Sequence, residues 1–318
     1  MPTEDFAALK VRRRARPPAA ALDWAGEVVG SRIARVQPLT GGMSTGIHLL
    51  RAVSGERVVM RRFLNQHWLA IDPHLAVREA AVLRALEPTA VPAPAYVGVD
   101  PHGDRCEAPT VLMGFVPGGR GTPTDLRAYA AELAHAMATI HDVAPPPIAG
   151  FPDEREQISR IVHEVSPNRH GSNPTPALWA KVGAALPRVS WTPNVLIHGD
   201  FHPGNVLFAR SRLTAVVDWP LAAAGQPASD VGMCRLDAGM MLGLDVADMI
   251  LAAYEAETGA PVADRGWWDL FAASRADGAL DSWTESYVGL GPTDPTLETV
   301  TSRFDDFVAS ALAATEMA

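Results

Sequence analysis

Cysteine, long apolar runs and clustered basic residues are all scarce in this 318-residue chain. The two cysteines, Cys106 and Cys234, lie far apart and give no disulfide framework, so we expect both to be reduced thiols. No stretch of about 20 residues is free of charge, so no transmembrane span is expected. No apolar core follows a basic region after Met1, so no secretory signal is expected either. These absences indicate a cytoplasmic protein.

The excess of acidic residues lies toward the C-terminal end. The net charge is -9; from Cys234 onward 15 Asp and Glu accompany 4 Arg, whereas the preceding residues carry 23 basic and 21 acidic groups. A nucleic-acid-binding protein would show a clustered basic face, and membrane targeting would need more basic residues or a lipid signal, so neither partner is expected. The acidic region could attract a cationic substrate, or it could consist of solvated helix faces.

The pattern along the chain predicts an α+β protein of roughly two domains. Residues 1–22 are expected to form a mobile arm or a first surface helix. Pro117-Gly118-Gly119 is expected to mark the domain boundary, after which the chain becomes mainly helical. The segments that read as strands before this boundary are 33–39, 48–53, 57–63, 95–99 and 109–116.

The stretch from Asn194 to Asp218 carries the strongest chemical signal. An apolar run leads to Asp200, a short loop leads to Asn205, and a predicted hairpin then ends at Asp218. Because the two ends of an antiparallel hairpin lie together, we expect the Asn205 amide near the Asp218 carboxylate, with Asp200 close by. Such oxygen-bearing side chains suit Mg²⁺, and their order is the one used for phosphoryl transfer in protein kinases.

This stretch has two other interpretations. His198, Asp200 and His202 could be ligands of a hydrolase metal ion, but this would leave Asn205 and Asp218 without a role. A purely structural turn would leave several crowded carboxylates unexplained.

The segment His198-Gly199-Asp200-Phe201-His202-Pro203-Gly204-Asn205, followed by Val217-Asp218-Trp219, resembles the signature of the aminoglycoside phosphotransferase and choline kinase superfamily. The resemblance covers residues 30 to 290. It implies a bilobal, protein-kinase-like fold, with a small antiparallel-sheet N-lobe over 1–116 and a helical C-lobe over 117–318. It also implies transfer of the γ-phosphoryl group of ATP, or GTP, to a hydroxyl of a small molecule. A monomer or a weak homodimer is expected.

In this resemblance the N-lobe holds the nucleotide. A glycine-bearing loop between strands can place backbone N–H groups over phosphates, although it departs from the G-x-G-x-x-G pattern of protein kinases. Residues Met113 to Phe115 would present backbone groups to adenine. The candidate phosphate contacts in the loop are Gly41, Gly42, Ser44 and Thr45.

Arg61 stands where the family places its phosphate-binding basic residue, with Arg62 as the alternative if the strand register slips by one. A helix is expected to begin at Asp72, and Glu79 falls on its apolar face. A buried carboxylate needs a cationic partner, so Arg61 is the expected partner of Glu79. A partly exposed Glu79 at the edge of the apolar face is the alternative.

The resemblance also assigns roles within the C-lobe. Asp200 would be the general base, and Asn205 and Asp218 would hold Mg²⁺. His198, grouped with Asp200 and Asp218 as a catalytic residue, would keep the loop in shape, as would His202.

Further along the C-lobe, a helix is expected to open at Pro227, and its Asp230 would brace the catalytic loop or cap the helix. His141 is expected to be structural. A single helix is expected over Trp267 to Trp283, whose tryptophans would lie in the core.

The sequence and the resemblance leave several candidate acceptors. A cationic acceptor, with an aminoglycoside or other amino-sugar antibiotic as first choice, would make the protein an antibiotic-resistance enzyme. The alternatives are a metabolic kinase for a sugar, choline-like or amino-alcohol substrate, a macrolide kinase, and a catalytically silent nucleotide-binding regulator.

Overall fold

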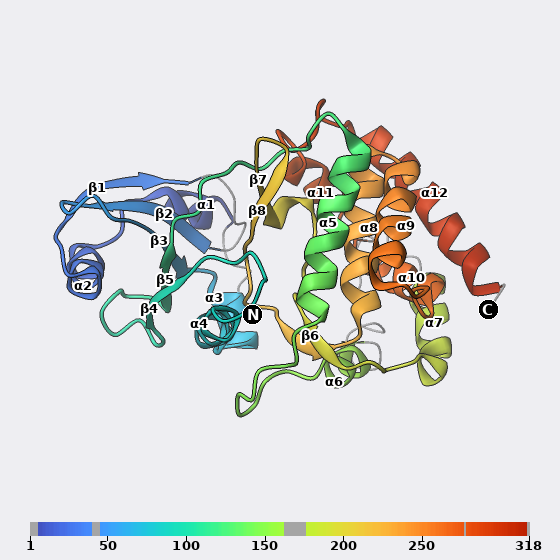
Figure 1. The fold of residues 1–318 in the computed structure, drawn as a ribbon, viewed down its shortest axis with the longest axis horizontal. Helices are drawn as coiled ribbons and strands as arrows, with labels where there is room; N and C mark the ends of the chain where they lie inside the picture. Colours follow the sequence, from blue (N-terminus) through green and yellow to red (C-terminus); the bar gives the residue numbers. More distant parts are fainter. Residues whose placement is uncertain (1–5, 40–44, 162–175, 277, 317–318) are drawn as a thin grey trace. The chain divides into compact units, whose positions relative to one another are not determined.

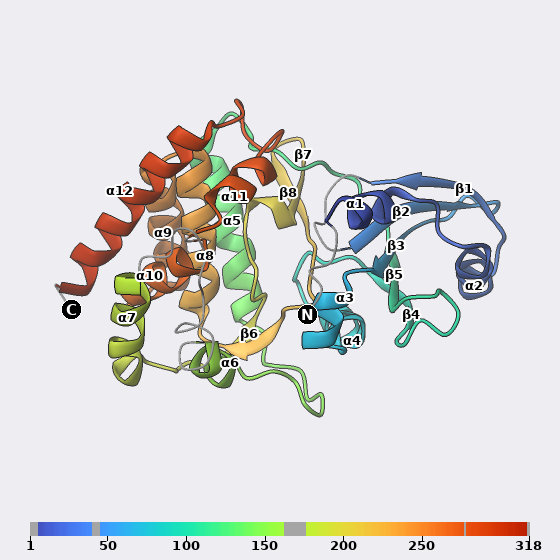
Figure 2. The same ribbon diagram turned by 180° about the vertical axis from the view of Figure 1, so that it is seen from behind.

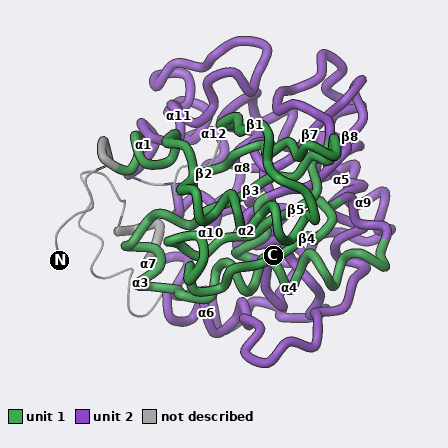
Figure 3. Tube along the Cα trace, turned by 90° about the vertical axis from the view of Figure 1, so that its left-hand side faces the viewer, with its two compact units in different colours: residues 1–89, 93–116, 218–221 green, residues 90–92, 117–217, 222–318 purple. Residues whose placement is uncertain are grey.

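The computed structural model describes residues 6–39, 45–161, 176–276 and 278–316, and the chain divides into two compact units (Figure 3). Unit 1 comprises residues 1–89, 93–116 and 218–221, and unit 2 comprises 90–92, 117–217 and 222–318. The return of residues 218–221 to unit 1 was not predicted from the sequence. It places Asp218 in unit 1, whereas Asp200 and Asn205 belong to unit 2.

Unit 1 is built on a five-stranded antiparallel sheet with the strand order β1-β2-β3-β5-β4 (Figure 1). Its strands are β1 (Ile33–Pro38), β2 (Thr45–Ala52), β3 (Arg57–Phe63), β4 (Tyr96–Asp100) and β5 (Thr110–Gly114). Its helices are α1 (Phe6–Arg14), α2 (Ala19–Val29), α3 (Gln66–Ile71) and α4 (Leu75–Leu86).

The two faces of this sheet pack against different helices, and Arg61 and Arg62 lie on opposite faces. On one face Trp24 of α2 packs on Leu50, Met60 and Leu112. Helix α1 contacts β2, so part of the N-terminal segment is a helix, one of the two predicted forms. Because side chains alternate across a strand, the neighbouring arginines of β3 point to opposite faces.

Helix α4 begins later than the sequence predicted. Asp72 is the C-terminal cap of the short helix α3, and α4 starts at Leu75. The Asp72 carboxylate accepts a hydrogen bond from the N–H of His74 and forms an ion pair with Arg78 at 2.6 Å. The carboxylate therefore holds the turn between two helices instead of opening one. The predicted burial of Glu79 is unaffected, and its exposure is 0 %.

Unit 2 is mainly helical, as predicted for the second lobe, so the predicted α+β fold class is confirmed. Figure 2 shows α12 beside α10, and these two helices pack with α8. The helices are α5 (Leu126–His141), α6 (Glu154–Arg160), α7 (Pro176–Ala185), α8 (Pro227–Leu242), α9 (Leu244–Thr258), α10 (Arg265–Ala276), α11 (Leu280–Ser286) and α12 (Leu297–Glu316). No helix in the described part of the chain is long and apolar enough to cross a membrane.

The predicted single helix over 267–283 is two helices. Helix α10 ends at Ala276, and Gly278, with φ +79°, occupies the left-handed region that commonly ends a helix. Trp267 and Trp268 are buried in the core of unit 2, as expected, whereas Trp283 is partly buried against that core. Both cysteines are buried free thiols.

Four short strands in unit 2 carry the signature segment. Strand β6 (Val195–Ile197) pairs with β9 (Ala223–Gly225), and β7 (Val206–Ala209) forms a hairpin with β8 (Arg212–Val216). A single 3-10 turn over Pro203–Asn205 leads into β7. The predicted hairpin is therefore present.

Candidate functional site

The loop after β6 is fixed to helix α8 through its backbone. The N–H groups of His198 and Gly199 donate to the two carboxylate oxygens of Asp230, at 2.7 and 2.9 Å. Gly199 has a φ of +77°, a left-handed conformation that glycine adopts without steric cost. Asp230 is 1 % exposed, and the N-terminal cap of α8 is Gln226. Asp230 therefore braces the loop, as the resemblance implied, and does not cap the helix.

Helix α5 supports Asp230 from the other side. His141 contacts the Tyr254 hydroxyl at 2.7 Å and the Asp230 carboxylate at 3.3 Å. Burial raises the pKa of Asp230, but its hydrogen bond from His141 and the backbone bond from His198 outweigh this and lower the pKa. His141 is structural, as predicted, and Asp230 remains a carboxylate.

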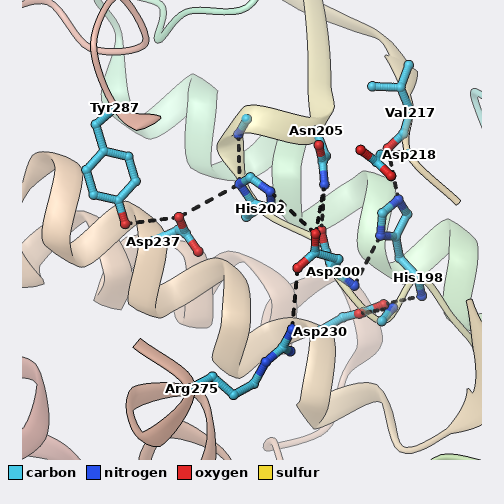
Figure 4. Close-up of polar contacts among 12 residues, drawn as sticks. His198, Asp200, His202, Asn205, Val217, Asp218, Asp230, Asp237, Arg275 and Tyr287 are labelled. Carbon is cyan, nitrogen blue, oxygen red and sulfur yellow. Dashed lines mark hydrogen bonds and ion pairs between the residues drawn. The ribbon is translucent and has the colours of Figure 1, made fainter. Parts of the chain in front are cut away.

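His198 uses both ring nitrogens within the protein (Figure 4). Its Nδ1 accepts the N–H of Asp200 at 3.3 Å, so the proton lies on Nε2, which donates to the carbonyl of Val217 at 3.0 Å. This imidazole therefore connects the loop after β6 to the end of the hairpin. A role in holding the loop fits this geometry better than a role as base or metal ligand.

Asn205 is oriented by the same loop. Its side-chain amide nitrogen donates to the backbone carbonyl of Asp200 at 3.0 Å, and its backbone carbonyl accepts the N–H of Val217 at 2.8 Å. The amide oxygen is then the side-chain atom that can bind a cation. The hairpin is thus closed by a backbone hydrogen bond between Asn205 and Val217, the residue before Asp218. The relative positions of the Asn205 and Asp218 side chains stay a prediction, because the two residues belong to different units.

The Asp200 carboxylate is 31 % exposed and has two basic neighbours (Figure 4). His202 Nε2 lies 3.8 Å from Oδ2, and Arg275 Nη2 of helix α10 lies 3.6 Å from Oδ1. His202 Nδ1 accepts the N–H of Gly204. Both distances exceed that of a strong hydrogen bond, so the carboxylate can exchange partners.

A second carboxylate lies behind His202. Asp237 of α8 is 4 % exposed, accepts a hydrogen bond from Tyr287 at 3.0 Å and lies 3.8 Å from His202 Nδ1. Burial raises its pKa to about 6, although His202 and Arg275 oppose the shift. Sequence analysis did not single out Asp237, Tyr287 or Arg275.

In unit 1 Arg61 joins two carboxylates. Its Nη1 lies 2.9 Å from Glu79 Oε1, and its Nη2 lies 2.6 Å from Asp218 Oδ1. The ion pair expected with Glu79 is present, so the alternative of an exposed Glu79 is wrong. Glu79 also accepts the N–H of Trp219 at 3.3 Å, which fixes the segment after Asp218 to helix α4.

Arg61 and Glu79 are buried, whereas the Asp218 carboxylate is 25 % exposed. Burial disfavours the charged guanidinium, but Asp218 and Glu79 outweigh that effect and raise the pKa of Arg61. Burial also raises the pKa of Glu79, with Arg61 opposing the shift. Asp218 has a φ of +75°, a left-handed conformation that aspartate tolerates better than most residues.

The other residues predicted to bind the nucleotide differ in their contacts with the rest of the protein. Arg62 donates to the carbonyl of Cys106 at 2.8 Å, away from the triad. The N–H groups of Gly114 and Phe115 donate to the carbonyls of Ala95 and Arg57, so these two backbone donors are engaged within the protein, and the adenine contact of residues 113–115 stays a prediction. Thr45 is buried in β2. Gly41, Gly42 and Ser44 lie outside the described residues.

The described residues contain no group of three or more His, Cys, Asp or Glu that could hold a metal ion. Both nitrogens of His198 have protein partners, which argues against the hydrolase interpretation. Amide and carboxylate oxygens, by contrast, are the ligands that Mg²⁺ prefers.

Fold and site together define a small-molecule phosphotransferase with a protein-kinase-like fold. A family model described as "Phosphotransferase enzyme family" matches residues 35–271, and the chain belongs to that family. This confirms the family resemblance and the predicted enzyme class.

Solved structures with low sequence identity share the fold. A thermostable mutant of aminoglycoside phosphotransferase APH(4)-Ia, in complex with ADP and hygromycin B, is 17% identical; the match covers 92% of this chain and 99% of that one, with a TM-score of 0.63. Macrolide 2'-phosphotransferase MphH from Brachybacterium faecium is 19% identical over 92% of this chain and 96% of its own, with a TM-score of 0.58.

A curated relative extends well beyond the matched region. The mouse protein acyl-CoA dehydrogenase family member 10 is 25% identical over 210 residues, which represent 60% of this chain. The match covers 19% of the mouse protein, so the similarity concerns one part of a longer relative.

Proposed function

We propose that this protein transfers the γ-phosphoryl group of ATP to a hydroxyl group of a small molecule, with Asp200 as the general base. The observation that carries the proposal is the placement of Asp200. Its loop is fixed by Asp230, while its carboxylate remains partly exposed. Such a carboxylate is able to accept a hydrogen bond from an incoming hydroxyl.

In the proposed reaction Asp200 accepts the hydrogen bond of the acceptor hydroxyl and takes its proton. The acceptor oxygen forms a bond to the γ-phosphorus as the bond to the ADP oxygen breaks. Because positioning and charge neutralisation dominate phosphoryl transfer, Asp200 need not be strongly basic.

Arg61 is the residue proposed to hold the α and β phosphates. Its guanidinium is fixed by Glu79 and Asp218, so it would meet the nucleotide in a defined orientation. The relative crystallised with ADP supports a nucleotide as the donor.

Asn205 and Asp218 are proposed to hold Mg²⁺. The fit is supported by the Asn205 amide, whose nitrogen is bonded to the Asp200 carbonyl, and by the Asp218 carboxylate, which is 25 % exposed. When bound, Mg²⁺ would neutralise charge on the phosphate oxygens.

A cationic acceptor, with an aminoglycoside or another amino sugar as first choice, is proposed from the acidic composition after Cys234. The relative bound to hygromycin B supports this choice, and the structural likeness to a macrolide 2'-phosphotransferase makes a macrolide the second candidate. Choline, amino alcohols and sugars complete the candidate set.

The test is ATP consumption against a panel of aminoglycosides, macrolides, choline and sugars, with and without Mg²⁺. One acceptor should stimulate Mg²⁺-dependent turnover, and product phosphorylation should be visible by mass spectrometry. Asp200→Ala should lower kcat by about a thousandfold or more, because the base is lost. Nucleotide affinity should survive.

Asp305→Ala is the matched control, because Asp305 is an exposed aspartate of α12, and it should behave as wild type. Turnover of Asp200→Ala near the wild-type rate would contradict the assigned role. ATP binding without stimulation by any acceptor would favour the silent regulator.

A further inference from the structure

Arg275 is a basic residue beside the proposed base that the mechanism above does not use. It lies near the end of α10, a helix packed against α8 and α12 in the core of unit 2. Its Nη2 is 3.6 Å from Asp200 Oδ1, and its side chain is 32 % exposed. The guanidinium is therefore carried by a fixed helix and reaches solvent at the carboxylate.

We propose that Arg275 binds the phosphoryl group while it passes to the acceptor, and neutralises its charge; this rests on the proposed function. The acceptor hydroxyl must lie against Asp200 when it attacks phosphorus. A guanidinium within 4 Å of that carboxylate is then within reach of the phosphoryl oxygens.

The contacts of Arg275 differ from those of a structural arginine in the same unit. Arg235 is 0 % exposed and donates to the Ala247 carbonyl at 2.7 Å and to Asp269 at 3.2 Å. The contact of Arg275 with Asp200 is longer than a hydrogen bond and lies at a partly exposed position. Its planar set of N–H donors suits two oxygens of a phosphoryl group.

The catalytic loop itself provides little positive charge. Residues 200–205 contain neither lysine nor arginine. Among the described residues, Arg275 is the arginine that the structure places beside Asp200.

Two buried acids besides Asp200 lie within the electrostatic reach of Arg275. Besides Asp200, its charge acts on Asp237 and Glu154, where it opposes the rise of each carboxyl pKa that burial causes. As the acceptor oxygen bonds to phosphorus and ADP leaves, Asp200 takes the hydroxyl proton. Arg275 can then turn its donors from the carboxylate to the phosphoryl oxygens.

The test compares two nucleotide complexes by calorimetry and needs no acceptor. ADP with Mg²⁺ and aluminium fluoride mimics the phosphoryl group in transfer, whereas AMP-PNP with Mg²⁺ mimics bound ATP. Arg275→Met should weaken the aluminium fluoride complex by about a hundredfold and change AMP-PNP affinity less than about twofold. Arg275→Lys should fall between, because lysine keeps the charge but not the fork.

Arg265→Met is the matched control, since Arg265 begins the same helix, is 26 % exposed and pairs with Asp269 at 3.7 Å. It should leave both affinities unchanged. Added guanidinium should restore part of the aluminium fluoride affinity of Arg275→Met, which a merely structural role would not allow.

The other outcomes distinguish a failure of this inference from a failure of the proposed function. Unchanged aluminium fluoride affinity in Arg275→Met would overturn this inference and leave the proposed function standing. Equal losses for both complexes would also overturn it, because Arg275 would then only maintain the fold. A wild-type protein that binds neither complex would overturn the proposed function, and the inference with it.

Discussion

The charged clusters of the two units are held in opposite ways. In unit 1 Arg61 is 5 % exposed, and its ion pairs with Glu79 and Asp218 measure 2.9 and 2.6 Å. In unit 2 the Asp200 carboxylate is 31 % exposed, and its basic neighbours lie 3.6 and 3.8 Å away. The cluster of unit 1 is closed, because its charged groups form short ion pairs with one another, whereas the cluster of unit 2 is open, because its carboxylate is partly exposed and its basic neighbours lie beyond hydrogen-bond distance.

The difference lies in what each unit fixes. Unit 2 fixes the backbone of its loop, through the bonds from His198 and Gly199 to Asp230, and leaves the Asp200 side chain able to change partner. Unit 1 fixes the Arg61 side chain itself. A phosphate-binding cation benefits from a preset orientation, whereas a general base must release its resting contacts to meet the acceptor.

Removing the backbone brace should have the largest effect in this comparison. Asp230→Ala leaves the buried N–H of His198 without its acceptor, at a cost of about 1 to 3 kcal/mol in the free energy of unfolding, and also removes the acceptor of the half-buried Gly199 N–H. The displaced loop should lower kcat by about a hundredfold. Nucleotide affinity should change little, because the Arg61 triad is untouched. Steady-state kinetics and calorimetry measure the two quantities.

Asp248→Ala serves as the control for Asp230→Ala. Asp248 is 57 % exposed and also accepts from a basic partner, Arg235, so its loss should leave kcat within about twofold. An unchanged kcat in folded Asp230→Ala would show that the brace does not position the base.

The sequence predicted the contacts that follow from local order. The motif from His198 to Asn205 and the hairpin that follows fix their own neighbours within a few residues. Glu79 was predicted to be buried because helical spacing alone places it on an apolar face, and a buried carboxylate needs a cation.

The sequence could not predict contacts that depend on how distant helices pack. Arg275 reads as an ordinary surface arginine until α10 is placed beside the catalytic loop. The count of acids after Cys234 did not show which of them face solvent, because several are partnered internally. Asp237 accepts from Tyr287, Asp269 pairs with Arg235, and only the fold reveals these partners. The predicted start of α4 was wrong because the Asp72 carboxylate accepts a local hydrogen bond from the N–H of His74.

The closed cluster can be tested by exchanging each arginine of β3. Arg61→Lys should weaken Mg²⁺–AMP-PNP binding by about tenfold, because an ammonium cannot bridge Glu79 and Asp218 as the planar guanidinium does. Arg62→Lys should change the affinity less than about twofold, since Arg62 donates to the Cys106 carbonyl instead. Calorimetry on the two variants compares them directly.

The same pair of variants decides between the two strand registers. A loss of affinity confined to Arg62→Lys would assign the phosphate contact to Arg62 and contradict the proposed role of the triad. Equal small losses in both would show that neither arginine meets the nucleotide.

The smallest expected effect concerns Glu154, a buried carboxylate of unit 2. It is 6 % exposed and accepts the N–H of Gln226 at 3.0 Å. Burial raises its pKa from 4.5 to about 8, although hydrogen bonds from Ser229 and Gln226 oppose the shift. Between these pH values the unfolded chain releases a proton that the folded chain retains, so this residue makes stability fall as pH rises.

Glu154→Gln cannot ionise and should lose that part of the pH dependence. Its urea midpoint should match wild type at pH 5 and exceed it at pH 8, with a gain of about 1 to 3 kcal/mol in the free energy of unfolding. Glu156→Gln, at an exposed position of the same helix, should follow the wild-type curve. Parallel curves for wild type and Glu154→Gln would mean that the folded protein holds Glu154 ionised.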